Sequence, residues 1–238
     1  MKILAIECSA TPCSVAVIED GKIISSAFVN VKLTHSQTLM PMVEDVLKSA
    51  MLSIAEIDGL AVSEGPGSFT GIRIGISAIK GIGAVRKLPC VGVSTLKAMA
   101  QNYADTNCIV CSVMDARCNQ VYNALFDIED GVITRLCEDR ALLCDELAEE
   151  IKKISQNGEK SVIIIGDGAE VFYPFVKELD NVIMAHSDKR YQNAIGVAFE
   201  AQSAFYSGET VSPNELLPVY LRLPQAEREL KNKKEQGK

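Results

Sequence analysis

The sequence predicts an α/β fold built from two similar lobes, each a mixed sheet covered by helices. The first observation is an internal repeat: residues 15–25 (VAVIEDGKIIS) and 125–135 (LFDIEDGVITR) each place Glu-Asp-Gly between two apolar runs. Asp-Gly in that position is a strong hairpin signal, because glycine accepts the positive φ of a tight turn. The second observation is that both copies continue through the same order of elements. A repeat spacing of about one hundred residues indicates duplicated domains rather than a solenoid.

The first copy occupies the N-terminal part of the chain. Its expected elements are a strand over residues 2–6 that ends on Glu7, a hairpin with its turn at residues 20–21, a helix from His35 to about residue 51, a strand that ends at Ser63, and a turn at residues 65–67 that opens another helix. The helix is predicted because its apolar residues recur at three- and four-residue spacing. Strands that alternate with helices in this way predict a mixed sheet with helices packed on it.

The second copy repeats this order. Its expected elements are a strand over residues 109–114 that ends on Asp115, a hairpin with its turn at residues 130–131, a helix around residues 145–154, a strand over residues 162–165, and a Gly-x-Gly turn at residues 166–168. These positions predict an N-terminal lobe over residues 1–104 and a C-terminal lobe over residues 105–208. Residues 209–238 are expected to return to the first lobe and to end in a frayed basic tail at residues 231–234.

Composition narrows the class of function. The chain has 238 residues, of which 47% are hydrophobic, so it can bury a full core. Acidic residues exceed basic ones by 31 − 24 = 7, which disfavours a protein that grips nucleic acid alone. Glu7 interrupts the apolar start of the chain, which argues against a signal peptide, and no apolar run approaches the length of a membrane span. A cytoplasmic protein without membrane contact is expected.

Cysteine and histidine usage points away from disulfides and metals. The eight cysteines show no framework spacing and mostly lie within apolar runs, so buried thiols in a reducing compartment are expected. Cys108 and Cys111 form a C-x-x-C, but positions three apart in a strand point to opposite faces. The two histidines, His35 and His186, have no ligand spacing, so no metal site is assigned.

An acidic residue at the strand end before each hairpin resembles the plan of the actin/hexokinase/Hsp70-like (ASKHA) superfamily. That resemblance implies a nucleotide site between the two hairpin loops, with Glu7, Ser9, Thr11 and Asp115 as candidates. The loops are degenerate, because neither contains the glycine that lets backbone amides reach phosphates, and Pro12 removes an amide donor. Ser9 and Thr11 could contact an anion or cap a turn. No catalytic residue and no cofactor is assigned.

The glycine-rich stretch GPGSFTGIRIG at residues 65–75 is not a P-loop, because its spacing differs and no lysine follows. In the helix that follows the turn, Gly71, Gly75, Ala78 and Ile82 share one face. Glycine inside a helix costs about 1 kcal/mol relative to alanine, and close approach of another backbone would compensate for it. That backbone belongs either to a partner protein or to the chain's own sheet.

The helix that begins at His35 has a broad apolar surface. One stripe consists of Leu39, Val43, Val46, Leu47 and Ala50, and Met40, Met42 and Met51 widen it. A surface helix needs only one stripe for its own core, and a methionine-rich apolar surface suits a protein partner. A wide helix that faces the core is the alternative.

Five motifs resemble the TsaB family, also called YeaZ. They are MKILAIECS at 1–9, HSQTLMP at 35–41, GPGSFTGIRIG at 65–75, DARCNQVY at 115–122 and PVYLR at 218–222. The similarity implies a subunit, inactive alone, of the bacterial machinery that makes N6-threonylcarbamoyladenosine at adenosine 37 of tRNAs reading codons that begin with A. It implies a TsaD-like transferase and a TsaE-like ATPase as partners, a homodimer when the chain is alone, and contact with tRNA only through the complex.

The resemblance also implies which residues form the interface with TsaD or with a second copy of this chain. They are His35, Leu39, Met40, Met42, Val43, Leu47, Phe69, Gly71, Gly75, Ala78 and Ile82. The chain departs from TsaD after Pro89, where TsaD carries an H-x-x-x-H metal motif and this chain has no histidine through Ala100. Gln120 stands where TsaB-like sequences often have glutamate.

Two other functions stay open at this point. An independent ASKHA-type nucleotide-binding enzyme, such as a small-molecule kinase or an ATPase, is opposed by the missing loop glycines. A tRNA-binding module is opposed by the net charge of −7.

Overall fold

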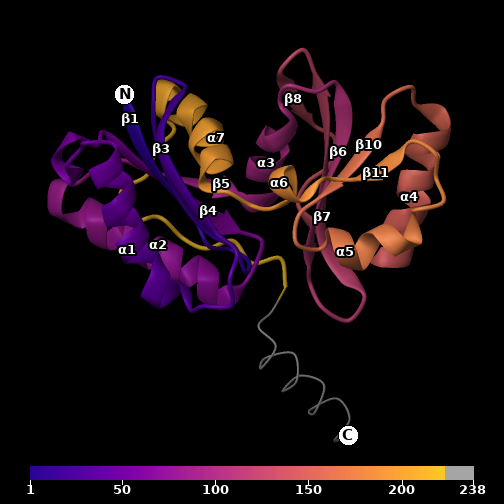
Figure 1. The fold of residues 1–238 in the computed structure, drawn as a ribbon, viewed down its shortest axis with the longest axis horizontal. Coiled ribbons are helices and arrows are strands. Elements are labelled where there is room, and N and C mark those ends of the chain that lie inside the picture. Colours follow the sequence, from indigo (N-terminus) through magenta and orange to yellow (C-terminus); the bar gives the residue numbers. More distant parts are fainter. Residues whose placement is uncertain (223–238) are drawn as a thin grey trace, which may run out of the picture.

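The computed structural model describes residues 1–222, which form two lobes lying side by side (Figure 1). The strands of the first lobe are β1 (Lys2–Glu7), β2 (Cys13–Glu19), β3 (Lys22–Val29), β4 (Gly59–Gly65) and β5 (Cys90–Ser94). They form one sheet in the order β3-β2-β1-β4-β5, in which the first three strands are antiparallel and β4 and β5 run parallel to β1.

The second lobe repeats this sheet. Its strands are β6 (Cys108–Asp115), β7 (Gln120–Glu129), β8 (Val132–Arg135), β9 (Arg140–Leu143), β10 (Val162–Ile165) and β11 (Val182–Met184). The order is β11-β10-β6-β7-β8, with β9 paired to β7. From the opposite edge the order is β8-β7-β6-β10-β11, so β6, β7 and β8 take the places of β1, β2 and β3, and β10 and β11 take those of β4 and β5. The predicted duplicated, two-lobed ASKHA fold is therefore confirmed, including the strand ends at Glu7 and Asp115.

Both predicted hairpins form with the expected turn chemistry. Asp20 and Gly21 have φ values of 47° and 78°, and Asp130 and Gly131 have φ values of 49° and 81°. Positive φ at both central residues is the mark of the type I′ turn, whose twist matches that of the flanking strands.

The helices lie on both faces of the two sheets. They are α1 (His35–Ser49), η1 (Ile54–Glu56), α2 (Phe69–Arg86), α3 (Thr95–Ala100), η2 (Gln101–Tyr103), α4 (Cys144–Asn157), α5 (Ala169–Phe172), η3 (Tyr173–Phe175), α6 (Ser187–Arg190) and α7 (Ala194–Ser207). In the first lobe α1 and α2 cover one face of the sheet and α7 covers the other (Figure 1). Over residues 1–222 no helix is both long and apolar enough to cross a membrane.

Two helices cross the lobe boundary that the sequence predicts between residues 104 and 105. Helix α7 follows the second sheet in sequence, yet its Val197, Ala201 and Phe205 pack on the first sheet. Helix α3 precedes that boundary, yet its Leu96 and Met99 pack on the second sheet. The boundary therefore separates the strands but not the helices, and each lobe is completed by a helix from the other half of the chain.

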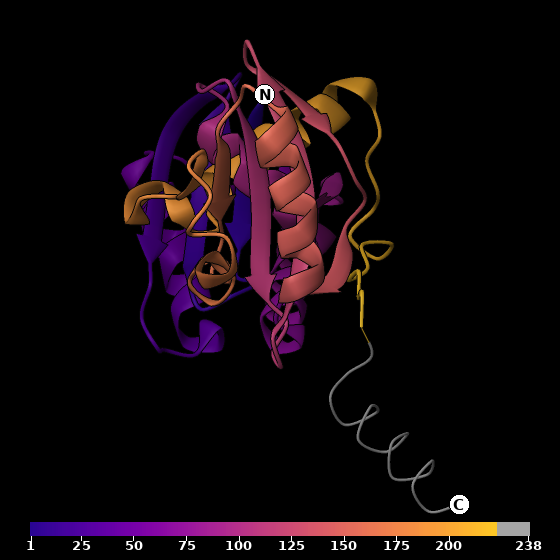
Figure 2. The same ribbon diagram turned by 90° about the vertical axis from the view of Figure 1, so that its right-hand side faces the viewer.

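The segment after α7 runs back along one edge of the molecule (Figure 2). Val211 pairs with Cys90 in β5, and the amide of Val219 donates to the carbonyl of Glu64 at 2.8 Å. These contacts return the segment to the first lobe. The Arg222 guanidinium then donates to the carbonyl of Ala116 at 2.6 Å, in the second lobe. The basic tail that was predicted at residues 231–234 lies outside the described residues.

The C-x-x-C pair behaves as strand geometry predicts. Cys108 packs into the apolar cluster on one face of the second sheet, and Cys111 packs into the cluster on the other face. All eight cysteines are free thiols, and burial raises the pKa of Cys108 to about 11.

Candidate functional site

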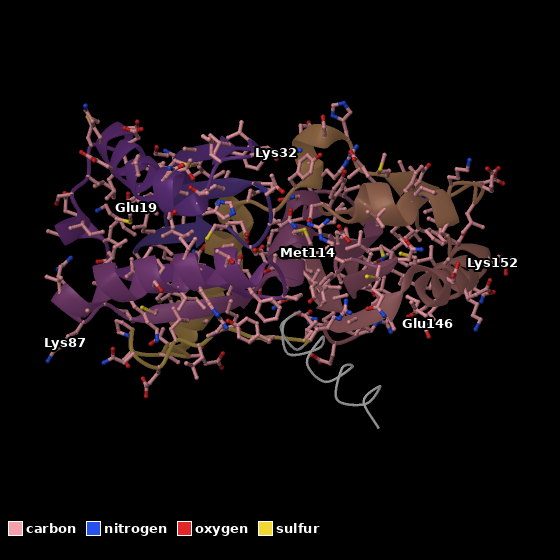
Figure 3. All side chains as sticks on the ribbon, turned by 90° about the horizontal axis from the view of Figure 1, so that it is seen from below. Glu19, Lys32, Lys87, Met114, Glu146 and Lys152 are labelled. Carbon is pink, nitrogen blue, oxygen red and sulfur yellow. The ribbon has the colours of Figure 1, made fainter. Side chains whose placement is uncertain are left out.

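The strand ends at Glu7 and Asp115 meet at a cleft of about 530 Å³ between the lobes. Its lining comes from both lobes: Ser9, Ala10, Thr11, Val31, Lys32, Leu33, His35, Gly67, Ser68, Phe69, Met114, Asp115, Ala116, Arg117, Tyr122 and Asp167. Figure 3 labels Lys32 and Met114, which line the cleft from the first and the second lobe. Of the four predicted nucleotide-site residues, Ser9, Thr11 and Asp115 line the cleft and Glu7 does not.

Glu7 lies beneath the floor of the cleft, with no exposed surface. The amide of Ser9 donates to its Oε1 at 2.6 Å, and the Ser63 hydroxyl donates to its Oε2. Burial raises the pKa of the Glu7 carboxyl, and the hydrogen bonds from Ser63 and Ser9 oppose that rise. Glu7 therefore uses its carboxyl to fix the turn that follows β1 and does not present it to a ligand.

The carboxyl of the second candidate acid, Asp115, is also bound within its own loop. Asp115 accepts a hydrogen bond from the amide of Arg117 at 2.7 Å and pairs with its guanidinium at 3.1 Å. Arg117, Cys118 and Asn119 all have positive φ, between 54° and 67°, so the loop closes tightly without glycine. A phosphate chain that entered here would meet carboxylates and would not meet a row of glycine amides.

Asp167 is a cleft residue that the sequence argument did not single out. It lies in the turn after β10, between two glycines, and the Gln192 side-chain amide donates to its Oδ1 at 2.6 Å. Burial, together with the nearby charges of Asp115 and Glu7, raises the pKa of its carboxyl to about 6, and the hydrogen bond from Gln192 opposes that rise. The Gly-Asp-Gly turn was visible in the sequence, but its place opposite Asp115 depends on how the second sheet folds.

The outer side of α1 and α2 is the second candidate site, and it faces the viewer of Figure 3, where Lys87 marks the end of α2. A groove of about 580 Å³ lies between the N-terminal halves of the two helices, and one of about 930 Å³ lies between their C-terminal halves. Met40 lines both grooves and is 48% exposed. Val85 beside them is 86% exposed. Together the grooves form one continuous apolar face, here called the α1–α2 face.

The predicted interface residues divide into four groups. The residues that line the grooves are His35, Leu39, Met40, Val43, Leu47, Ala78 and Ile82, of which Leu39 and Val43 are buried and form the floor. Met42 points into the core of the first lobe. Phe69 lies at the cleft, where its ring stacks on Tyr220 with 4.5 Å between ring centroids.

Gly71 and Gly75 form the fourth group, and the structure corrects the prediction made for them. A Cβ on Gly71 would run into the backbone carbonyl of Cys8, and one on Gly75 would lie 2.8 Å from the Cys8 sulfur and 3.1 Å from Val62. Both glycines are buried on the inward side of α2. Gly71 admits the backbone of Cys8, just after β1, and Gly75 admits the side chains of Cys8 and Val62, so the expectation that these glycines admit a partner helix is wrong.

Among the described residues, no group of three or more His, Cys, Asp or Glu side chains is placed to hold a metal ion. The lining of the cleft combines charged and apolar side chains, since Asp115 and Asp167 lie there with apolar and aromatic residues. The grooves of the α1–α2 face, by contrast, are lined mainly by apolar side chains of the two helices.

Comparisons with known proteins find matches that extend over both lobes. Residues 29–229 match the family model described as TsaD: tRNA N6-adenosine threonylcarbamoyltransferase. The tRNA threonylcarbamoyladenosine biosynthesis protein TsaB of Escherichia coli K12 is 34% identical, over 93% of this chain and 95% of its own length. The tRNA N6-adenosine threonylcarbamoyltransferase of Trichlorobacter lovleyi is 32% identical over 39% of this chain and 32% of its own length.

A solved structure agrees with these relatives. YeaZ from Pseudomonas aeruginosa superimposes with a TM-score of 0.79 at 28% identity, covering 92% of this chain and 99% of its own. The similarity to TsaB and YeaZ thus extends over both lobes and over nearly the whole of those relatives, whereas the match to the Trichlorobacter transferase covers 39% of this chain and 32% of that relative. The chain belongs to the TsaB family, also called YeaZ.

Proposed function

We propose that this chain is the non-catalytic partner subunit of the machinery that makes N6-threonylcarbamoyladenosine on tRNA, and that its α1–α2 face binds a TsaD-like transferase. The observation that carries the proposal is the continuous apolar face, on which Met40 and Val85 stay exposed in the single chain. Exposed apolar patches rimmed by charged residues mark protein interfaces. Glu44, Lys48 and Arg86 supply such a rim here.

The cleft supports the non-catalytic half of the proposal. Glu7 and Asp115, the acids at the two strand ends, are engaged by Ser63, Ser9 and Arg117 of the chain itself. In a phosphoryl-transfer site such acids hold a metal ion or a water. The names of the relatives support a role in this biosynthesis: the relatives that match over most of their own length are TsaB biosynthesis proteins, whereas the Trichlorobacter transferase is matched over 32% of its length.

The same proposal extends to the other partners. A TsaE-like ATPase joins the pair, tRNA is bound through the complex, and two copies of this chain pair through the α1–α2 face when no transferase is present. The net charge of −7 supports indirect contact with tRNA, because an acidic chain gains little from phosphate neutralisation.

A charge placed on the α1–α2 face tests the proposal. Met40→Asp and Ile82→Asp put a carboxylate where a partner would remove it from water, so binding to the TsaD-like subunit should weaken by more than about thirtyfold. Val132→Asp is the control, because Val132 is an exposed apolar residue (64%) on β8 of the other lobe. Titration calorimetry measures all three variants. Wild-type affinity in Met40→Asp and Ile82→Asp would overturn the proposal.

Nucleotide turnover separates this proposal from an independent enzyme. The isolated chain should hydrolyse no more ATP than a sample carrying both Asp115→Asn and Asp167→Asn. Turnover that these two substitutions abolish would assign the cleft an activity of its own and favour the nucleotide-enzyme alternative.

A further inference from the structure

The turn at residues 7–10, which follows β1, contacts the starts of both helices of the α1–α2 face. The Cys8 thiol donates to the carbonyl of Gly71 at 3.1 Å, in the first turn of α2. The carbonyl of Ser9 accepts a hydrogen bond from the amide of Ser68, the N-cap of α2, at 2.6 Å. These two bonds tie α2 to the end of β1.

The next residue of the turn holds α1. His35 is the first residue of α1, and its Nε2 lies 2.7 Å from the carbonyl oxygen of Ala10. A carbonyl oxygen can only accept, so Nε2 carries the proton in this contact. Successive residues of one turn therefore anchor α2 through Cys8 and Ser9, and α1 through Ala10.

Glu7 fixes the turn itself. One carboxylate oxygen accepts the amide of Ser9 and the other accepts the hydroxyl of Ser63 in β4, so the turn is locked to two neighbouring strands. Two glycines allow the turn to pack closely against α2, because Gly71 leaves room for the Cys8 carbonyl and Gly67 leaves room for Ser9. Side chains at these positions would push α2 away from the turn.

We infer that the turn at residues 7–10 is the anchor of the docking helices, and that Glu7 and His35 are positioning residues for partner binding. The inference rests on the proposed function, since the face held by this turn is the one that binds the transferase there. A partner that meets helices already fixed in place loses less conformational entropy than one that must order them. A loosened anchor should therefore weaken binding, and at Ser63, which is buried outside the α1–α2 face, it should do so without removing any contact with the partner.

Two substitutions of His35 give the sharpest test. In His35→Gln the side-chain amide nitrogen can take the place of Nε2 and donate to the Ala10 carbonyl, whereas the shorter side chain of His35→Asn does not reach it. We expect His35→Asn to bind the TsaD-like subunit about tenfold more weakly than wild type, and His35→Gln to stay within about threefold. Hydrogen exchange of the amides at the start of α1 should quicken in His35→Asn alone.

A second pair of variants tests the contact between Glu7 and β4. Ser63→Ala removes only the hydroxyl that donates to Glu7, at a position that is 1% exposed. Ser14→Ala is its matched control, because Ser14 is an equally buried serine of the same sheet whose hydroxyl instead accepts the amide of Ala194 at the start of α7. Ser63→Ala should weaken partner binding several-fold and quicken exchange at the start of α2, whereas Ser14→Ala should do neither.

The outcomes separate the inference from the function on which it rests. If Met40→Asp abolishes binding while His35→Asn and Ser63→Ala bind like wild type, the docking face stands and the anchor is overturned. If exchange quickens without loss of affinity, the positioning role is likewise overturned. If Met40→Asp itself binds like wild type, the proposed function falls, and exchange in the two anchor variants alone decides whether the turn holds the helices.

Discussion

Single residues of α2 show how one helix uses glycine in opposite ways. Gly71 packs so closely against the end of β1 that a side chain would meet backbone, whereas nothing lies within 4 Å of the place where a Cβ on Gly81 would stand. The first glycine is needed for packing. The second only lowers the stability of the helix, because glycine is a poor helix former wherever it makes no compensating contact.

This contrast gives a prediction for two substitutions in one helix. Gly81→Ala should raise the free energy of unfolding by about 0.5–1 kcal/mol through helix propensity alone. Gly71→Ala gains the same propensity but forces α2 away from Cys8, so it should lower the free energy of unfolding by about 1–3 kcal/mol. Urea unfolding of both variants checks the prediction. Equal effects of the two substitutions would contradict the inward packing of Gly71.

Asp167 gives a prediction for pH. Its pKa is about 6 in the folded chain, against an ordinary value of 3.8, so the folded state holds the proton more tightly than the unfolded state. Its contribution to stability therefore falls as pH rises from about 4 to about 6, by on the order of 2 kcal/mol. In Asp167→Asn the amide oxygen can still accept from Gln192, and no charge is buried.

The measurement is the difference in unfolding free energy between Asp167→Asn and wild type across pH. Taking the difference removes the pH dependence that the other carboxyls contribute to both proteins. It should be near zero at pH 4 and should favour the variant by about 2 kcal/mol at pH 7.5. A difference that does not change with pH would show that the Asp167 carboxyl is not held out of water.

Some individual residues of the cleft could be predicted from the sequence. The acids at Glu7 and Asp115 were found because each ends an apolar strand before a hairpin, which is a local pattern. That Glu7 turns inward was not predictable, because its partner Ser63 belongs to β4, which only the folded sheet brings beside the end of β1. Asp167 was missed for the same reason, since its position opposite Asp115 is a property of two strands.

Whole elements were predicted more fully than their packing. Both hairpins, the helix that begins at His35 and the strand over residues 162–165 follow from turn chemistry and apolar spacing, which are local. The packing of α3 and α7 across the lobe boundary is not local. Helix α7 is apolar on most sides, so its pattern does not say which of two sheets it will cover.

The C-terminal segment gives a prediction at the scale of an element. Leu216 and Leu217 are neighbours in it, but Leu216 is 2% exposed and packs into the core of the first lobe, whereas Leu217 is 65% exposed. Leu216→Ala should lower the free energy of unfolding by about 2–4 kcal/mol, and Leu217→Ala by less than about 0.5 kcal/mol. Thermal and urea unfolding of the two variants check this. A small effect of Leu216→Ala would mean that the segment is not part of the folded core.

At the scale of the whole molecule, the duplication is visible in sequence and sheet order, but the two halves are not independent. Ile3, Ile18, Val91 and Val93 belong to the first sheet, and the apolar cluster that buries them is completed by α7 from the far end of the chain. Helix α3 completes the second lobe in return. The lobes therefore share helices, and the chain should unfold as one cooperative unit.

Cutting the chain between residues 104 and 105 tests this exchange. Without α7, the fragment 1–104 exposes Ile3, Ile18, Val91 and Val93, each worth about 1.5–3 kcal/mol when buried. Their sum is comparable to the whole stability of a typical domain, about 5–15 kcal/mol, so neither this fragment nor 105–238 should fold alone. Mixing the two fragments should restore a dispersed amide spectrum, because each supplies the helix that the other lacks. A folded fragment 1–104 by itself would show that the first lobe is complete without α7 and that the halves are independent domains.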